Sequence, residues 1–251
     1  MITLTRTGDV AEIVLDAPSK LNALDRDDLA ELDAAFRDAQ GARAVVLRGE
    51  GRAFCAGRDI AGVDPATDDV PGYLGDVEAL MRRIAGFPAP TFAAVQGACL
   101  GVGLGLAIAA DVVYVADDAK IGSPFAGLGA VLDSGGHALL FERLGAHRAF
   151  DLIYTGELLS GADAVEAGLF SRSMPRDELL EFTRERAARA AAGPTESFLA
   201  SKRVIARLRD ARLWDAVHAE THEQEALRHT HDYIEGFAAF REKRKPDFTG
   251  E

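Results

Sequence analysis

Along the first half of the chain, segments with the apolar spacing of strands alternate with segments that have the apolar spacing of helices. Short apolar runs that end at turns predict strands over 2–7, 10–16, 42–49, 91–97 and 112–117. Helical spacing between them predicts helices over 28–39, 73–86 and 98–111, with Asp25 or Asp27 capping the first. Because strands separated by helices form βαβ units, we expect a largely parallel sheet covered by helices.

After residue 134 the pattern becomes almost entirely helical. The predicted helices are 134–144, 146–154, 162–167, 176–192, 194–209 and 213–239. We therefore expect an α/β core over residues 1–190, followed by a helical C-terminal region over 191–251. The polar segment 61–72, which contains proline and several aspartates, predicts a mobile loop.

Composition narrows the possible classes of protein. Hydrophobic residues make up 48% of the chain, but charged or polar residues interrupt every long apolar window, so no membrane span is predicted. The start "MITLTRTGDV" lacks the features of a signal peptide, and two cysteines cannot build a disulfide framework or a zinc site. A cytoplasmic location fits these features. The formal net charge of −12 argues against non-specific nucleic-acid binding.

Two glycine-rich loops are candidates for ligand binding: "FCAGRD" (54–59) and "GACLGVGLGL" (97–106). Glycine allows sharp turns, and a helix that begins after one presents unpaired N–H groups. Two such groups aimed at one point would stabilise a developing oxyanion. Tight packing of helix on sheet would use the same glycines. A dinucleotide-binding turn is disfavoured because its third glycine is not in place.

The stretch "VLDSGGHALL" (131–140) places one carboxylate, Asp133, between an apolar run and a Gly-Gly turn. Asp133 could cap a helix that begins near residue 134, where aspartate is favoured over alanine by about 1 kcal/mol. It could also transfer protons, because the adjacent Val131 and Leu132 would desolvate the carboxyl group and raise its pKa. These residues alone leave both roles open.

The glycine loops and the Asp133 segment together resemble the crotonase superfamily (enoyl-CoA hydratase/isomerase). The resemblance rests on "FCAGRD", "QGACLGVGLGLAIAADVVYV" and "IGSPFAGLGAVLDSGG" in this order, and extends to "DAPSKLNAL", "YTGELLSGADAVEAGLFSRSMP" and "EGFAAFREKRKPDF". It implies a ββα spiral with mostly parallel sheets and a helical C-terminal trimerisation region. It also implies acyl-CoA substrates, a homotrimer or a hexamer built as a dimer of trimers, and no metal or cofactor beyond the coenzyme A of the substrate.

The same resemblance assigns roles to individual residues. The backbone N–H groups of Arg58 and Val102 match the pair that holds the thioester oxygen. The two glutamates that activate water in the hydratases would fall at Gly105 and Phe125, which cannot transfer protons. Phe125 together with the "DSGG" motif resembles the branch typified by ring-1,2-epoxyphenylacetyl-CoA isomerase, in which the aspartate matching Asp133 is catalytic.

A single carboxylate suits an isomerase, in which Asp133 takes a proton from one carbon and returns it to another. Two alternatives remain open: an enoyl-CoA hydratase that uses Asp133 with an unidentified partner, and a non-catalytic acyl-CoA binding protein. A dehalogenase with Asp133 as nucleophile and an NAD-binding protein are more remote.

The resemblance also predicts the residues that would contact the substrate. Coenzyme A would meet Lys20, Ala23, Ala56, Phe240 and Lys243, the last two on a C-terminal helix that reaches a neighbouring subunit. The acyl pocket would be lined by Tyr73, Val77, Met81, Phe125 and His137. Ordinary helix packing explains Tyr73, Val77 and Met81 equally well, and His137 could simply pack or form a hydrogen bond.

Overall fold

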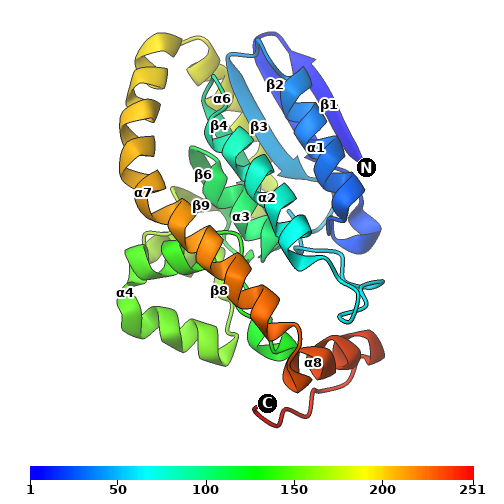
Figure 1. The fold of residues 1–251 in the computed structure, drawn as a ribbon. Helices are drawn as coiled ribbons and strands as arrows, with labels where there is room; N and C mark the ends of the chain where they lie inside the picture. Colours follow the sequence, from blue (N-terminus) through cyan, green and yellow to red (C-terminus); the bar gives the residue numbers. More distant parts are fainter.

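The computed structural model describes residues 1–251 and has a six-stranded sheet with the order β1-β2-β3-β4-β6-β9 (Figure 1). Strands β1 (Ile2–Thr7) and β2 (Val10–Leu15) form the antiparallel hairpin that the sequence predicts. All other pairs in this sheet are parallel. The remaining strands are β3 (Ala44–Gly49), β4 (Thr91–Val95), β6 (Val112–Ala116) and β9 (Arg172–Met174).

A second sheet has three strands in the order β5-β7-β8. Its first strand shows that the predicted helix over 98–111 was placed to begin too early. Its strands are β5 (Ala98–Leu100), β7 (Lys120–Gly122) and β8 (Leu159–Ser160). The first residues of the predicted helix are therefore strand, because β5 pairs in parallel with β7, and helix α3 (Val102–Ala109) begins only after Gly101. Strands of two or three residues are too short for their spacing to be recognised in the sequence.

Helices flank the six-stranded sheet, as expected for βαβ units (Figure 1). Besides α3, the helices before the C-terminal region are α1 (Arg26–Asp38), α2 (Val70–Ala85), α4 (Gly136–Thr155), α5 (Gly161–Glu166) and α6 (Arg176–Ala191). Asp25 caps α1 as predicted, and Gly145 interrupts α4 where two separate helices were expected. The short 3₁₀ helices are η1 (Pro18–Lys20) and η2 (Phe125–Leu128).

The C-terminal region differs from the expected pair of helices over 194–209 and 213–239. One helix, α7 (Thr195–Leu227), runs without a break through 209–213, where the sequence has no glycine or proline to end it. The break comes later, and Thr230 caps α8 (His231–Glu242) by accepting a hydrogen bond from the N–H of Tyr233. No helix is both long and apolar enough to cross a membrane.

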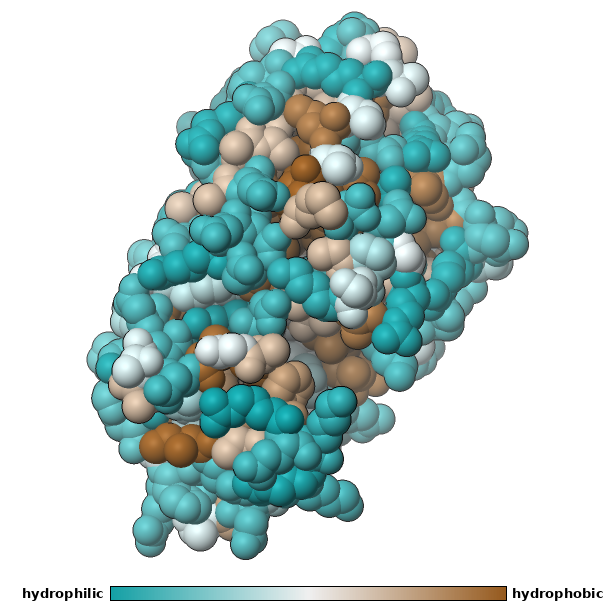
Figure 2. Space-filling model, turned by 90° about the vertical axis from the view of Figure 1, so that its right-hand side faces the viewer, coloured by the Kyte–Doolittle hydropathy of each residue, from teal (hydrophilic) through white to brown (hydrophobic).

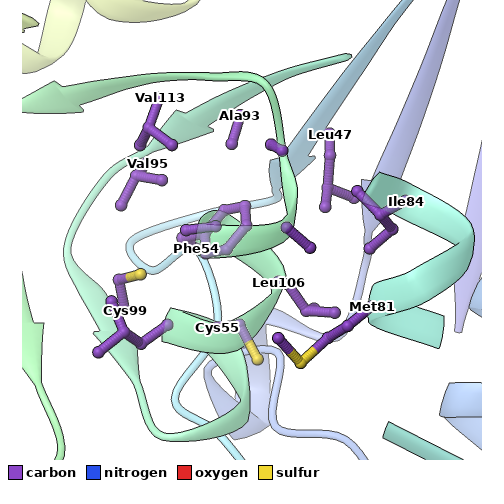
Figure 3. Packing of buried hydrophobic residues seen from close by; sticks show 14 of the residues in the cluster. Leu47, Phe54, Cys55, Met81, Ile84, Ala93, Val95, Cys99, Leu106 and Val113 are labelled. Atoms are coloured by element: carbon purple, nitrogen blue, oxygen red, sulfur yellow. The ribbon is translucent and has the colours of Figure 1, made fainter. Parts of the chain in front are cut away.

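The hydrophobic core fixes the base of the two glycine loops. Figure 3 shows Phe54 and Cys55 packed among side chains that include Leu106 and Met81. Phe54 and Cys55 have no exposed surface, so the loop that follows them starts from a rigid point. Figure 2 shows that the face carrying α1 is mostly hydrophilic, with hydrophobic side chains visible in the hollow between its upper and lower parts.

Candidate active site

The two glycine loops lie side by side through main-chain contacts. The N–H of Cys55 donates to the carbonyl of Ala98, and the N–H of Leu100 donates to the carbonyl of Cys55, both at 3.0 Å. Gly57 has a φ of +101°, and a Cβ there would lie 2.9 Å from the carbonyl oxygen of Leu100. This position therefore requires glycine, because a side chain would separate the two loops.

Each loop ends with an N–H group that makes no hydrogen bond within the protein: Arg58 in the first loop and Val102 in the second. Val102 is the first residue of α3, where helical N–H groups have no partner and the helix dipole is positive. A Cβ on Gly57 would lie 3.7 Å from the nitrogen of Val102, so the second donor is close to the first loop. This arrangement is able to hold a carbonyl oxygen that gains negative charge.

Asp133 lies in a buried loop immediately before α4. It is only 6% exposed, and one of its carboxylate oxygens accepts a hydrogen bond from the hydroxyl of Ser134 at 2.9 Å. Burial raises the pKa of Asp133 from 3.8 to about 7, and the charge of Glu220 adds to the rise. Ser134, Arg58 and His137 act in the opposite direction without cancelling it. The group is thus half ionised near neutral pH, as proton transfer requires.

The interpretation of Asp133 as a helix cap is wrong. Helix α4 begins at Gly136, after Gly135 in the left-handed conformation, and no side chain of the preceding segment caps it. The side chain of Glu220 on α7 accepts hydrogen bonds from the N–H of Gly135 at 2.7 Å and of His137 at 2.9 Å. An acid from α7 thus satisfies the start of α4, which leaves Asp133 free for another role.

Two polar residues of α7, Glu220 and Gln224, hold the Asp133 loop and were not identified from the sequence. Gln224 accepts a hydrogen bond from the N–H of Val131 at 3.0 Å, and both side chains are buried. The buried face of α7 runs through Leu213 and Val217 to these two residues at helical spacing. In the sequence, two polar residues that continue the apolar stripe of a helix indicate buried polar side chains, and this pattern could have identified Glu220 and Gln224.

No carboxylate could occupy the Gly105 position. A Cβ on Gly105 would lie 2.5 Å from the Cβ of Ser134, so the Asp133 loop itself fills the space. The second position at which the hydratases have a glutamate is Phe125 in this chain. Its ring lies 2.9 Å from where a Cβ on Gly101 would be. Glu220, a buried acid whose charge acts on Asp133, already accepts hydrogen bonds from the N–H groups of Gly135 and His137 and is bonded to Nδ1 of His137.

The side chain of Arg58 belongs to the site as well as its N–H group. Its guanidinium lies 4.1 Å from the ring centroid of Tyr73 and donates two hydrogen bonds to Asp68, at 2.6 and 2.8 Å. Tyr73 in turn donates from its hydroxyl to the carbonyl of Leu24 at 2.9 Å. The contact with Asp68 could not be predicted from the sequence, because Asp68 lies in the polar segment expected to be a mobile loop.

The other residues expected in the acyl pocket occupy different environments. Met81 is buried on α2, and its sulfur lies 3.2 Å from where a Cβ on Gly105 would be, so it borders the Asp133 loop. Val77 is also buried on α2, in the hydrophobic core. His137 is half-buried and bonds through Nδ1 to Glu220 at 2.9 Å, which fits the hydrogen-bonding role that the sequence left open.

Of the residues predicted to bind coenzyme A, three lie together. The N–H of Ala56 donates to the carbonyl of Leu21, between Lys20 and Ala23. The ammonium of Lys20 pairs with Asp28 at 2.7 Å. Burial lowers the pKa of Lys20, but the bond to Asp28 raises it, and the net effect is a raised pKa. The other two, Phe240 and Lys243, are exposed on and just after α8 and make no hydrogen bond or ion pair with the first three.

The geometry thus combines two free main-chain donors with one buried acid of raised pKa. No three His, Cys, Asp or Glu side chains come together as a metal site. The donors and the acid lie against the same helix, since α3 begins at Val102 and contacts Ser134 at Gly105. Such a site can polarise a carbonyl group and move a proton on a neighbouring carbon.

Comparison with known proteins gives a consistent result across the whole chain. Residues 5–251 match the model of the family described as enoyl-CoA hydratase/isomerase. A Rhodobacter capsulatus protein named probable enoyl-CoA hydratase is 37% identical over 243 residues, 96% of this chain and 95% of that protein. The 1,2-epoxyphenylacetyl-CoA isomerase of Escherichia coli is 33% identical over 250 residues, with 96% and 95% covered. The crystal structure of an enoyl-CoA hydratase from Mycobacterium avium subsp. paratuberculosis superimposes with a TM-score of 0.88 at 29% identity, covering 99% of this chain and 98% of that one.

Proposed function

Because this chain belongs to the enoyl-CoA hydratase/isomerase family, we propose that it is an acyl-CoA isomerase with Asp133 as its only proton-transfer group. The observation that carries this proposal is the buried carboxyl group of Asp133 in a site with two free main-chain donors, and its pKa is raised to about 7. An isomerase needs one group that takes a proton and returns it, and a pKa near the working pH serves both steps.

The proposed reaction begins with the thioester carbonyl between the N–H groups of Arg58 and Val102. Ionised Asp133 takes a proton from the carbon next to the carbonyl, or from the third carbon along, and the electrons move onto the carbonyl oxygen. The two N–H groups stabilise that oxyanion, and a donor of this kind contributes about 3–4 kcal/mol. Asp133 then returns the proton to a different carbon, which shifts a double bond or rearranges a ring. No cofactor beyond the coenzyme A of the substrate takes part.

Hydration of an enoyl-CoA is the second candidate function, and the names of several relatives favour it. A hydratase needs groups that activate water and protonate carbon, usually paired carboxylates. Asp133 would supply one of them, and Glu220 is a second buried acid nearby; the side chain of Asp68, also largely buried, is bonded to Arg58. Since Glu220 is held by the start of α4, we propose isomerisation as the main activity.

We also propose that the protein assembles as a homotrimer or as a dimer of trimers. The apolar side chains of Val204, Ile205 and Leu208 are exposed on the middle of α7, where a neighbouring subunit would cover them. A neighbouring copy would also bring Phe240 and Lys243 to the coenzyme A of another subunit.

A substrate panel tests the proposed function directly. Wild-type protein and Asp133→Asn are incubated with 3-enoyl-, dienoyl- and aromatic-derived CoA esters, and the products are identified by mass spectrometry and NMR. We expect isomerised product from the wild type and a loss of roughly 10²- to 10⁴-fold in rate for the variant. Crotonyl-CoA hydration, followed by absorbance, is the comparison. Rapid hydration without isomerisation of any ester would replace this proposal with the hydratase.

A further inference from the structure

Tyr233 on α8 has a buried hydroxyl group that bonds to nothing in the protein. The residue has no exposed surface, and its Oη is one of three buried side-chain polar atoms without a hydrogen-bond partner. Tyr73, the other tyrosine near Arg58, donates instead to the carbonyl of Leu24. A buried polar group without a partner is costly, so such a group calls for an explanation.

The position of Tyr233 is fixed by close contact between α8 and η2. A Cβ on Gly129 would lie 2.6 Å from the carbonyl group of Asp232, and a Cβ on Gly236 would lie 2.4 Å from the carbonyl group of Leu128. The backbone of α8 therefore rests directly on the segment that begins with Phe125. The ring of Tyr233 stacks on Phe237 with 4.5 Å between centroids, which leaves its hydroxyl as the only unsatisfied part.

The hydroxyl lies near the active site, because α8 rests on the segment that begins with Phe125, whose ring borders Gly101 of the second glycine loop. The charges of Asp68, Arg58 and Asp133 all act on it. Burial raises the pKa of Tyr233 well above its usual value, so the hydroxyl stays protonated and able to donate. Arg58 and Asp68 are already bonded to each other, so neither is left to pair with it.

We propose that Tyr233 is a substrate-contacting residue that selects the acyl group by donating a hydrogen bond from its hydroxyl to an acceptor atom beyond the thioester. The proposal rests on the proposed function only in taking the space beside Asp133 as the acyl site. Because the hydroxyl is enclosed in the unliganded protein, an acyl group reaches it only by displacing the side chains around it. A hydrocarbon acyl chain then leaves the hydroxyl unpaired, whereas an acyl group that carries an oxygen in reach satisfies it. Tyr233 thus favours oxygen-bearing acyl groups over hydrocarbon ones.

Binding of unreactive esters tests this role independently of catalysis. Dissociation constants of hexanoyl-CoA, 5-hydroxyhexanoyl-CoA and 6-hydroxyhexanoyl-CoA are measured by calorimetry for the wild type and Tyr233→Phe. We expect at least one hydroxy ester to bind the wild type roughly tenfold more tightly than hexanoyl-CoA, and we expect this preference to vanish in the variant. Hexanoyl-CoA should bind both proteins equally. A preference that persists in Tyr233→Phe, or its absence in the wild type, would overturn the proposal.

Two further measurements separate a substrate contact from a structural role. Tyr233→Phe should unfold at the same urea concentration as the wild type or a higher one, because the lost hydroxyl makes no hydrogen bond in the folded protein. Tyr114→Phe, which removes a hydroxyl from β6 outside the site, should leave the preference unchanged. Clear destabilisation by Tyr233→Phe would show a structural role and contradict the proposal. These esters do not react, so the measured preference does not depend on catalysis. It would therefore still test the role of Tyr233 if the protein proved not to be an isomerase.

Discussion

The two halves of the candidate site are held in place by different means. The oxyanion half, which comprises the loops around Gly57 and Gly101, is fixed by main-chain hydrogen bonds between neighbouring strands and turns. The acid half, residues 131–137, pairs with no strand and is held by the side chains of Glu220 and Gln224, 83 to 93 residues further along the chain. The first half thus depends on backbone shape and the second on two buried polar side chains.

This difference matters because main-chain and side-chain anchors respond differently to mutation. Removing a side chain from the oxyanion half leaves its donors in place, since they are backbone atoms. Removing one from α7 releases the loop that positions Asp133. We therefore expect α7 substitutions far from the substrate to impair catalysis, whereas in the oxyanion half the position of the donors should depend on the glycines.

The largest expected effect is that of Glu220→Ala. It leaves the N–H groups of Gly135 and His137 buried without an acceptor, which should cost about 3–5 kcal/mol of unfolding free energy. Urea unfolding measures the cost, and turnover should fall with it because the Asp133 loop is released. Glu223→Ala, at an exposed position on the same helix, is the control and should behave like the wild type. Equal stability of the two variants would show that α7 does not anchor the acid half.

Asp133→Asn should raise stability while it lowers turnover roughly 10²- to 10⁴-fold. The gain in stability should depend on pH, and this dependence identifies its cause. Folding raises the pKa of Asp133, so folding favours the protonated carboxyl group, and this stability is lost as the pH rises from 3.8 through about 7. At pH 8 the buried charge costs the wild type about 4 kcal/mol, which asparagine avoids. Urea unfolding should show the variant as the more stable protein at pH 8, with the gap closing towards pH 4. A gap that does not change with pH would contradict a raised pKa.

The smallest effect concerns the oxyanion half. Gly101 has a φ of +49°, and a Cβ there would lie 2.9 Å from the ring of Phe125. Gly101→Ala should therefore cost about 1–3 kcal/mol and weaken turnover by displacing the N–H of Val102. Gly62→Ala is the matched control, because Gly62 has open space and no positive φ. If both variants keep full activity, the backbone shape of this loop does not set the position of the donor.

The same contrast explains what the sequence could predict. The hairpin, the parallel sheet, most helices and the glycine loops follow from spacing and turn residues that lie close together in the chain. The roles of Glu220, Gln224 and Tyr233 depend on where α7 and α8 pack, which no local pattern specifies. The break between these helices was misplaced: residues 209–213 contain no glycine or proline that would end a helix, and the break lies instead at Thr230, which caps α8.

The burial of Asp133 was expected from its apolar neighbours, but the reason that it does not cap α4 was not. The local sequence favours an aspartate that caps the following helix. The structure shows instead that Glu220 on α7 accepts the hydrogen bonds from the first N–H groups of α4. Similarly, the absence of glutamate at Gly105 is visible in the sequence, whereas the contact with Ser134 that excludes any side chain requires the fold.

The most direct test of a single proton-transfer acid is the pH dependence of solvent deuterium exchange into a bound acyl-CoA substrate, followed by mass spectrometry. Exchange by the wild type should rise through one ionisation near pH 7, the pKa of Asp133, and remain level above it. Asp133→Asn should show no exchange above background at any pH. Exchange that survives in this variant, or a profile with two ionisations, would contradict the account.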